Sequence, residues 1–416
     1  MLAPRKFLFA LTCGIIGGMV VVACINYLVD PYGIYSLTDS DQLRNKKPTA
    51  ATKGPMVKAY QLERTNARTL VLGNSRAEVG FDPLDPGWPQ GNRPIYNAAL
   101  PGTGPRTALL YLQHALTSFH PDTIVMGVDF MDFLVATKAP TKTNLPPSEL
   151  ESRLSTTFDG NPNPYRQQQQ LRDIAATIFS LDALLDSIQT IAARNDPFAV
   201  DLTPRGFNPM KDYIRIAREE GYRAIFLQRD EENIKAYLKR PHSIYLENST
   251  TSPPLDDIRH IIVLCKKNNI RLKLVIYPYH ARLLEIIDAT GHWDAFEQWK
   301  MALARIVQET APSLVTLWDF SGYNAYTMEP VPGKRDMQAQ TKWYWEAGHF
   351  KKELGGVILG RMFSTRHTAE DAANSFGSVV TLEMLPHHLE NIRRQRNIYW
   401  QRFPSDVTVI RSIVRK

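Results

Sequence analysis

Short apolar runs alternate with segments of helical periodicity along most of the chain. The apolar runs predict buried strands over residues 68–73, 94–100, 123–129, 272–277 and 314–318. The segments between them repeat apolar residues three or four positions apart, which predicts helices over 103–119, 256–267, 293–308 and 351–362. Because repeated strand–helix–strand units build a parallel sheet covered by helices, the pattern predicts an α/β fold.

The amino-terminal segment differs from the rest because residues 7–29 are apolar and carry no charge. At about 1.5 Å per helical residue, this run is long enough to cross a hydrocarbon core of about 30 Å. Arg5 and Lys6 precede it, as expected for a cytoplasmic flank. We therefore expect a single-pass membrane anchor over residues 1–30. Val21-Val-Ala-Cys24 also resembles a lipoprotein cleavage box, so a lipid tether at Cys24 is the alternative.

Composition divides the remaining chain into three parts. Turn formers and scattered lysines predict a stalk over 31–67. We expect the α/β domain over 68–365, with a helical insertion at about 133–253 that could form a lid or bind a partner. Residues 366–416 form a basic tail, in which lysines and arginines alternate with aromatic residues from Met384 onwards. This tail suits an anionic membrane surface, a solvated segment or a packed helix.

The net charge limits the classes of binding partner, and the cysteine content limits the disulfide bonds that the chain can form. The formal net charge is +7, but no helix-turn-helix, zinc-ligand spacing or Walker loop accompanies it. We therefore expect an acidic polymer or the cell envelope as partner, and no nucleic acid. Three cysteines, two of them in the anchor, cannot form a disulfide framework. No sequence feature calls for a metal or another cofactor.

The end of the first predicted strand carries the main candidate for chemistry. Gly73 lets the backbone turn sharply at the carboxyl end of this strand, and Asn74 and Ser75 follow it. In α/β sheets this edge is where ligands bind, so Ser75 is a candidate nucleophile. Asn and Ser also cap helices frequently, and this structural role stays open beside the functional one.

A second candidate lies near the end of the domain. Glu346 and His349 are three residues apart, a spacing that brings a carboxylate beside an imidazole in a turn or a first helical turn. The carboxylate would orient the ring and stabilise the imidazolium that forms when His349 accepts a proton from serine. His280 is a rival base and Asp319 a rival acid, although both are more typical of residues that structure the edge of a crevice.

Taken together, these blocks resemble the SGNH (GDSL-like) hydrolases and acyltransferases. The matching blocks are Gly73-Asn-Ser-Arg76, Asn97-Ala-Ala-Leu-Pro-Gly102 and Glu346-Ala-Gly-His349. The resemblance covers about residues 68–130 and 255–363, and glutamate replaces the usual aspartate of the last block. It implies a flavodoxin-like three-layer sandwich with a parallel sheet. It also implies that Ser75, His349 and Glu346 are catalytic and that the backbone amide of Gly102 binds the oxyanion.

One block departs from the family pattern. Where the family has Gly-x-Asn-Asp, this chain has Gly127-Val-Asp129-Phe130. Losing an amide donor removes about 3 kcal/mol of transition-state stabilisation. An ionised Asp129 about 4 Å away would instead repel the oxyanion by about 4 kcal/mol at an effective dielectric of about 20. Either Asp129 is protonated, or it points elsewhere and Asn74 or Asn97 donates, or the site binds glycan without turnover.

A membrane anchor joined to such a domain is similar to envelope proteins that modify polysaccharides, such as the alginate O-acetylation and teichoic-acid D-alanylation proteins. The resemblance implies an acyltransferase outside the cytoplasm that acts on an envelope polysaccharide, and it suggests a polytopic membrane acyl-transfer partner. An envelope carbohydrate esterase and a non-catalytic glycan-assembly scaffold are the alternatives. Four aromatic residues suit either sugar stacking or the core: Trp318, Tyr323, Trp343 and Trp345.

Overall fold

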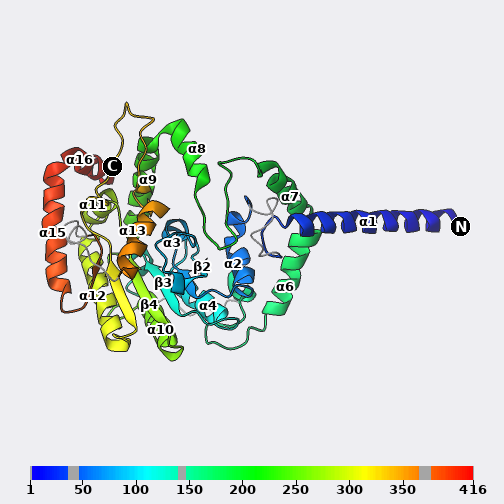
Figure 1. Cartoon of the computed structure of the whole chain (residues 1–416), viewed down its shortest axis with the longest axis horizontal. Coiled ribbons are helices and arrows are strands. Elements are labelled where there is room, and N and C mark those ends of the chain that lie inside the picture. Colours follow the sequence, from blue (N-terminus) through cyan, green and yellow to red (C-terminus); the bar gives the residue numbers. More distant parts are fainter. Residues whose placement is uncertain (1, 36–45, 139–146, 365–375, 416) are drawn as a thin grey trace.

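A computed structural model gives the arrangement of residues 2–35, 46–138, 147–364 and 376–415. In these ranges the chain folds into an α/β body, and helix α1 (Leu2–Val29) projects from it (Figure 1). The α/β class predicted from the alternating pattern is confirmed.

A six-stranded, mostly parallel sheet forms the centre of the body, in the order β2-β1-β3-β4-β5-β8. The five strands from β2 to β5 are parallel, and β8 pairs with β5 in the antiparallel direction. The strands are β1 (Thr69–Leu72), β2 (Ile95–Asn97), β3 (Thr123–Val128), β4 (Arg271–Ile276), β5 (Val315–Asp319) and β8 (Ser378–Val379). Strands β1 and β3 are buried along their whole length, which explains their continuous apolar sequences.

Helices between the strands cover the sheet. They are α3 (Ser75–Gly80), α4 (Pro105–Ala115), α10 (Pro253–Lys267), α11 (Ala281–Ala289), α12 (Trp293–Thr310) and α13 (Lys352–Phe363). Helix α10 packs against both α4 and α12, whereas α13 packs against α3. Two short 3₁₀ turns, η2 (Gln90–Asn92) and η3 (Phe130–Phe133), lie in the loops. Pro105 occupies the first turn of α4, where its missing N–H breaks no helical hydrogen bond.

The strand order reverses at β1, because β2 pairs on one side of it and β3 on the other. In open α/β sheets, ligands bind beyond the carboxyl ends of the strands at such a reversal. Gly73 follows β1 there with φ 137°, and a Cβ at this position would lie 2.6 Å from the hydroxyl oxygen of Tyr277. Only glycine fits this turn, and the turn directs the residues after β1 into the crevice.

The insertion between β3 and β4 is helical. It contains α5 (Glu149–Arg153), α6 (Arg166–Ile174), the π-helical turn η4 (Ala175–Phe179), α7 (Leu181–Ala193), α8 (Lys211–Glu220) and α9 (Tyr222–Leu238). The helix suggested by the pattern over 171–193 is broken, since the chain bends by 56° between η4 and α7. Ser180 lies at the bend and caps α7 by accepting a hydrogen bond from the backbone N–H of Ala183.

The segment expected to be a stalk, 31–67, is partly folded into the body; its residues 36–45 lie outside the described ranges. Helix α2 (Gly54–Leu62) follows the 3₁₀ turn η1 (Ala51–Lys53) and packs against α4 and α5. Val57 and Leu62 of this helix are completely buried. A stalk would leave these side chains in water, so the described part of this segment belongs to the domain.

The expected basic tail is also folded, except that residues 366–375 and 416 lie outside the described ranges. It contains β8, α15 (Leu385–Arg402) and α16 (Pro404–Val414), and these helices pack against α12 and α11. Its cations pair with acidic side chains of α11 and α12, as in the ion pairs Arg393–Glu297, Arg396–Asp288 and Arg411–Glu285. The packed-helix alternative therefore describes this segment, because much of its charge is compensated within the fold.

Lys58 of α2 supports α3 through a buried ion pair. Its side chain is completely buried, and Nζ lies 2.8 Å from Oε1 of Glu78. Nζ also donates to the carbonyl oxygen of Ala99. Burial lowers the pKa of Lys58, although the charge of Glu78 opposes this shift.

Replacing Lys58 by methionine is expected to lower the free energy of unfolding by about 3–5 kcal/mol, because Glu78 is left buried without a partner. Denaturant unfolding of the full chain in detergent measures this loss. Lys58→Met/Glu78→Met removes both charges together and is expected to recover most of it. A double variant less stable than Lys58→Met would contradict the assignment.

Helix α1 has the length and composition of a membrane span. Among the described helices, Pro4–Val29 passes this test as a single helix, and the body buries none of its apolar window. This result agrees with the anchor expected over residues 1–30.

Candidate active site

Three predicted residues from opposite ends of the domain meet at the strand-order reversal. Ser75 is the first residue of α3, and its Oγ lies 2.8 Å from Nε2 of His349. Nδ1 of His349 hydrogen-bonds Oε1 of Glu346. A hydroxyl, an imidazole and a carboxylate linked in this order form the arrangement that activates a serine for nucleophilic attack. The structure brings the three side chains together, and their catalytic role remains a prediction.

A short antiparallel hairpin holds Glu346 and His349. Its strands are β6 (Tyr344–Glu346) and β7 (His349–Phe350), so the predicted pair lies across a turn and not in a helix. The backbone N–H of Gly348 donates to Oε2 of Glu346 at 2.7 Å. Burial alone would raise the pKa of Glu346, but His349, this N–H and the charge of Arg76 outweigh it and lower the pKa to about 2. Glu346 is therefore a carboxylate at neutral pH and can stabilise an imidazolium.

Asn74 caps α3, as its sequence position allowed. Its Oδ1 accepts a hydrogen bond from the backbone N–H of Arg76 at 3.1 Å. Its Nδ2 donates to Oδ2 of Asp129 at 2.8 Å and to Oδ2 of Asp132 at 3.3 Å. Because an amide nitrogen has two protons, both donors of Asn74 are engaged and neither is directed to an oxyanion.

Asn97 links α3 to the loop after β2 through side-chain hydrogen bonds. Its side chain is completely buried, and Nδ2 donates to the carbonyl oxygens of Ala77 and Phe81, both at 2.9 Å. Its Oδ1 accepts from the backbone N–H of Ala99. With both amide protons used inside the fold, Asn97 has a structural role in this geometry.

Asp129, which stands where an amide donor was expected, is paired with Arg76. The two side chains form a buried ion pair, and Oδ1 of Asp129 also accepts from the Tyr279 hydroxyl at 3.0 Å. Nε of Arg76 donates to the carbonyl oxygen of Gly348 at 2.6 Å. Arg76 therefore joins the start of α3, the end of β3 and the turn of the hairpin. The negative charge of Asp129 is compensated by the residue that follows the candidate nucleophile.

The roles of Arg76 and Tyr279 were missed by sequence reasoning. The available signal for this ion pair was a pair of complementary residues: an arginine directly follows the candidate serine, and an aspartate stands in place of an amide. Tyr279 gave no such signal, because its contact with Asp129 depends on the loop after β4.

Gly102 lies exposed in the loop between β2 and α4. Its φ is 69°, and a Cβ at this position would meet no described atom within 4 Å. Glycine is therefore favoured there by backbone conformation and not by lack of space. The backbone amides of Ser75 and Gly102 remain the predicted oxyanion donors.

The two rival residues are both engaged within the fold. His280 is buried, and burial lowers its pKa to about 3. Its Nε2 donates to the carbonyl oxygen of Glu329 at 2.8 Å, while Nδ1 accepts a backbone N–H at the start of α11. Asp319 is held by Nζ of Lys300 at 2.7 Å and by Nε2 of His388 at 2.8 Å. Both therefore structure the crevice edge, as their positions suggested.

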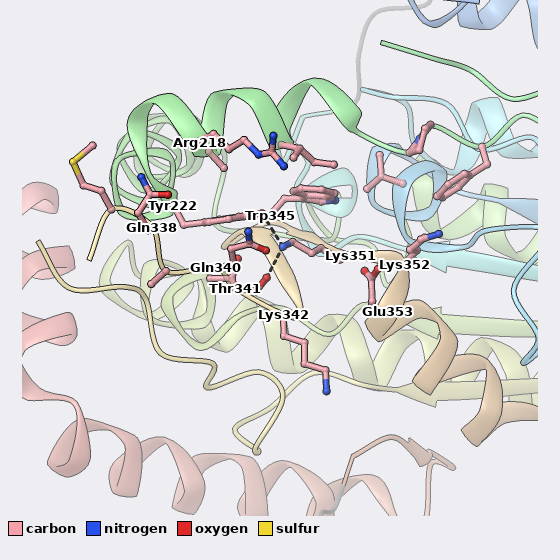
Figure 2. Close-up of a pocket in the computed structure, with 17 residues that line it drawn as sticks. Arg218, Tyr222, Gln338, Gln340, Thr341, Lys342, Trp345, Lys351, Lys352 and Glu353 are labelled. Carbon is pink, nitrogen blue, oxygen red and sulfur yellow. Dashed lines mark hydrogen bonds between the residues drawn. The ribbon is translucent and has the colours of Figure 1, made fainter. Parts of the chain in front are cut away.

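A pocket of about 410 Å³ lies beside the hairpin (Figure 2). Trp345 of β6 precedes Glu346, and Lys351 lies two residues after His349, so the pocket adjoins the hairpin, although Ser75, Glu346 and His349 do not line it. Its charged lining residues are Arg218, Lys342, Lys351, Lys352 and Glu353, and the ammonium of Lys342 lies over the ring of Trp343. Burial lowers the pKa of Lys351 to about 8, although Glu329 and Glu353 favour its charged form.

The aromatic candidates lie in or against the core. Trp318, Tyr323 and Trp345 belong to the buried core, and Trp343 is partly buried against it. Trp345 lines the pocket, with Nζ of Lys351 4.6 Å from its ring centroid, and Lys342 lies over the ring of Trp343. Only the last two aromatics are thus near groups that a ligand could also contact.

Within the described ranges, no cluster of three or more His, Cys, Asp or Glu side chains is arranged as a metal site requires. No protein-family model matches the chain, and no curated protein is significantly similar to it in sequence.

Proposed function

We propose that this chain is a membrane-anchored, SGNH-like acyltransferase that modifies an envelope polysaccharide through an acyl-enzyme on Ser75. The observation that carries the proposal is the hydrogen-bonded series from Ser75 to His349 to Glu346 at the carboxyl end of β1. The strand order β2-β1-β3-β4-β5, which is that of flavodoxin-like sheets, supports the family assignment. The anchor is consistent with a body on the extracytoplasmic side.

The proposed chemistry has two steps that share one base. Oγ of Ser75 attacks the carbonyl carbon of an ester donor while Nε2 of His349 takes the hydroxyl proton, and the backbone amides of Ser75 and Gly102 bind the oxyanion. The tetrahedral intermediate collapses, and His349 returns the proton to the leaving alcohol. A sugar hydroxyl then attacks the acyl-serine with His349 as base again, which forms the sugar ester and frees Ser75.

The pocket beside the hairpin suits an acidic glycan as acceptor. Trp345 and Tyr222 line the pocket, and Arg218 and Lys351 lie beside them, whereas Lys342 points away (Figure 2). Carboxylate-bearing sugars present both a flat ring face and a negative charge, and a cation-lined pocket raises their local concentration. A polytopic membrane protein that delivers the acyl group is the partner that this proposal implies.

Incubating the purified full chain with p-nitrophenyl acetate and oligosaccharides tests the proposal. Acetylated sugar is expected to exceed free acetate when acidic oligosaccharides are present, with smaller amounts from neutral ones. Ser75→Ala is the matched control and is expected to give neither product. Free acetate as the main product at saturating concentrations of several glycans would make the protein an envelope esterase. A folded chain that forms no acyl-enzyme would favour a glycan-assembly scaffold.

A further inference from the structure

Helix α7 has its apolar and polar faces reversed relative to a helix that packs in water. Leu181, Leu185 and Ile188 recur at helical spacing on one face and are 67%, 64% and 54% exposed. The opposite face is buried and consists of small or polar residues, namely Ala183, Ser187 and Thr190. A helix on an aqueous surface directs its apolar stripe to the core, so the outer face of α7 is built for an apolar environment.

The exposed apolar surface continues around the bend into η4 and α6. We call residues 166–193 the elbow. Leu171, Ile174 and Phe179 are exposed in its first arm, as is Ile191 near its end. This surface spans two helices and is larger than the scattered apolar residues that normally occur on a protein surface.

The elbow is fixed to the end of the anchor helix. Nδ2 of Asn26 donates to the carbonyl oxygens of Ile178 at 2.9 Å and Ser180 at 3.2 Å, and its Oδ1 accepts from Oγ of Ser187 at 2.9 Å. The Tyr32 hydroxyl donates to Oδ2 of Asp186 at 2.6 Å. These contacts hold the elbow at the level where α1 leaves the body.

The directions of these helices match a membrane surface. In Figure 1, α6 and α7 lie at the base of α1 and run across its axis, and both α7 and η4 contact α1. If α1 runs along the membrane normal, the elbow lies parallel to the membrane plane. Tyr27 and Leu28 are exposed on α1 directly after Asn26, which bonds to the elbow, so both elements carry exposed apolar side chains at this end of the anchor.

We propose that the elbow lies in the interfacial region of the lipid leaflet from which α1 emerges, with Leu181, Leu185 and Ile188 among the acyl chains. Burial of such an apolar face at the boundary between headgroups and acyl chains is how interfacial helices bind membranes. The contact of α7 and η4 with the end of α1 favours lipid over a protein partner, because one planar apolar layer can cover the exposed apolar side chains of all three elements. The elbow then fixes the tilt of the body, which α1 alone would leave free to vary. This inference rests on the anchor and not on the chemistry proposed for Ser75.

Spin labels on the full chain in nanodiscs of phosphatidylethanolamine and phosphatidylglycerol test the proposal. Labels are attached to Leu185→Cys and Ile188→Cys in a Cys13→Ala/Cys24→Ala background. Cys265 is kept, since it is buried and burial raises the pKa of its thiol to about 12. Ile398→Cys on α15 is the matched control, because this residue is 56% exposed and lies on a helix distant from α1 (Figure 1).

Molecular oxygen, which concentrates in the bilayer, is expected to relax the labels at 185 and 188 several-fold more strongly than a water-soluble nickel chelate does. The control label at 398 is expected to show the opposite order. Equal nickel accessibility at the elbow and at 398 would overturn the proposal. Labels shielded from both reagents would overturn it too, and would assign the face to a second copy of the chain.

Discussion

Ser75→Ala and His349→Ala are each expected to reduce acyl transfer by about 10⁶-fold, because either change removes the activated nucleophile. The double variant is expected to lose little more, since the two residues act as one unit. Glu346→Gln leaves the ring in place but removes the charge that stabilises the imidazolium, so a smaller loss of about 10⁴-fold is expected. Initial rates with an activated ester and intact-mass detection of the acyl-enzyme measure these effects.

His280→Ala is the control for the choice of base. His280 accepts a backbone N–H at the start of α11, and its loss is expected to lower stability by about 1 kcal/mol while the acyl-enzyme still forms. If His280→Ala abolished the acyl-enzyme while His349→Ala retained near-wild-type rates, the assignment of the base would be wrong.

The buried strands were the most predictable part of the fold. β1, β3, β4 and β5 begin and end within one residue of the ranges predicted from the apolar runs, because these parallel strands are covered on both faces. β2 is shorter than predicted and ends at Asn97, whose side chain bonds to α3. β8 has two residues, too few for any periodicity to reveal.

The folded ends of the chain were predicted poorly for a different reason. Lys58 suggested a solvent-exposed stalk, and the basic residues of α15 and α16 left a membrane-bound, a solvated and a packed segment equally open, because lysine and arginine are rarely buried. Their partners, such as Glu78 and Glu285, lie in distant segments whose proximity depends on the tertiary fold. From composition alone, residues that pack against the domain were therefore assigned to a stalk and a tail.

Within the site, the candidate residues that follow β1 and β3 were identified from sequence, but the contacts between loops were not. Asn74 and Asp129 are 55 positions apart, and Arg76 and Gly348 are 272 positions apart. Parallel strands bring such loops to one edge of the sheet, yet they do not determine which side chains meet there. The sequence therefore left open how Asp129 is accommodated, and the structure gives the answer as pairing with Arg76.

Arg76→Met is expected to lower kcat/KM for acyl transfer by about 10³-fold with Ser75 and His349 intact. Without the guanidinium, Asp129 becomes an uncompensated charge near the proposed oxyanion, and at about 4 Å this repulsion is about 4 kcal/mol at an effective dielectric of about 20. Asp129→Asn in the Arg76→Met background removes the charge and supplies an amide donor, so most of the rate is expected to return. Rates are compared for variants whose thermal unfolding midpoints are similar. If the double variant stays as slow as Arg76→Met, the explanation by charge compensation of Asp129 is wrong. Arg76 then acts by holding the hairpin through its hydrogen bond to Gly348.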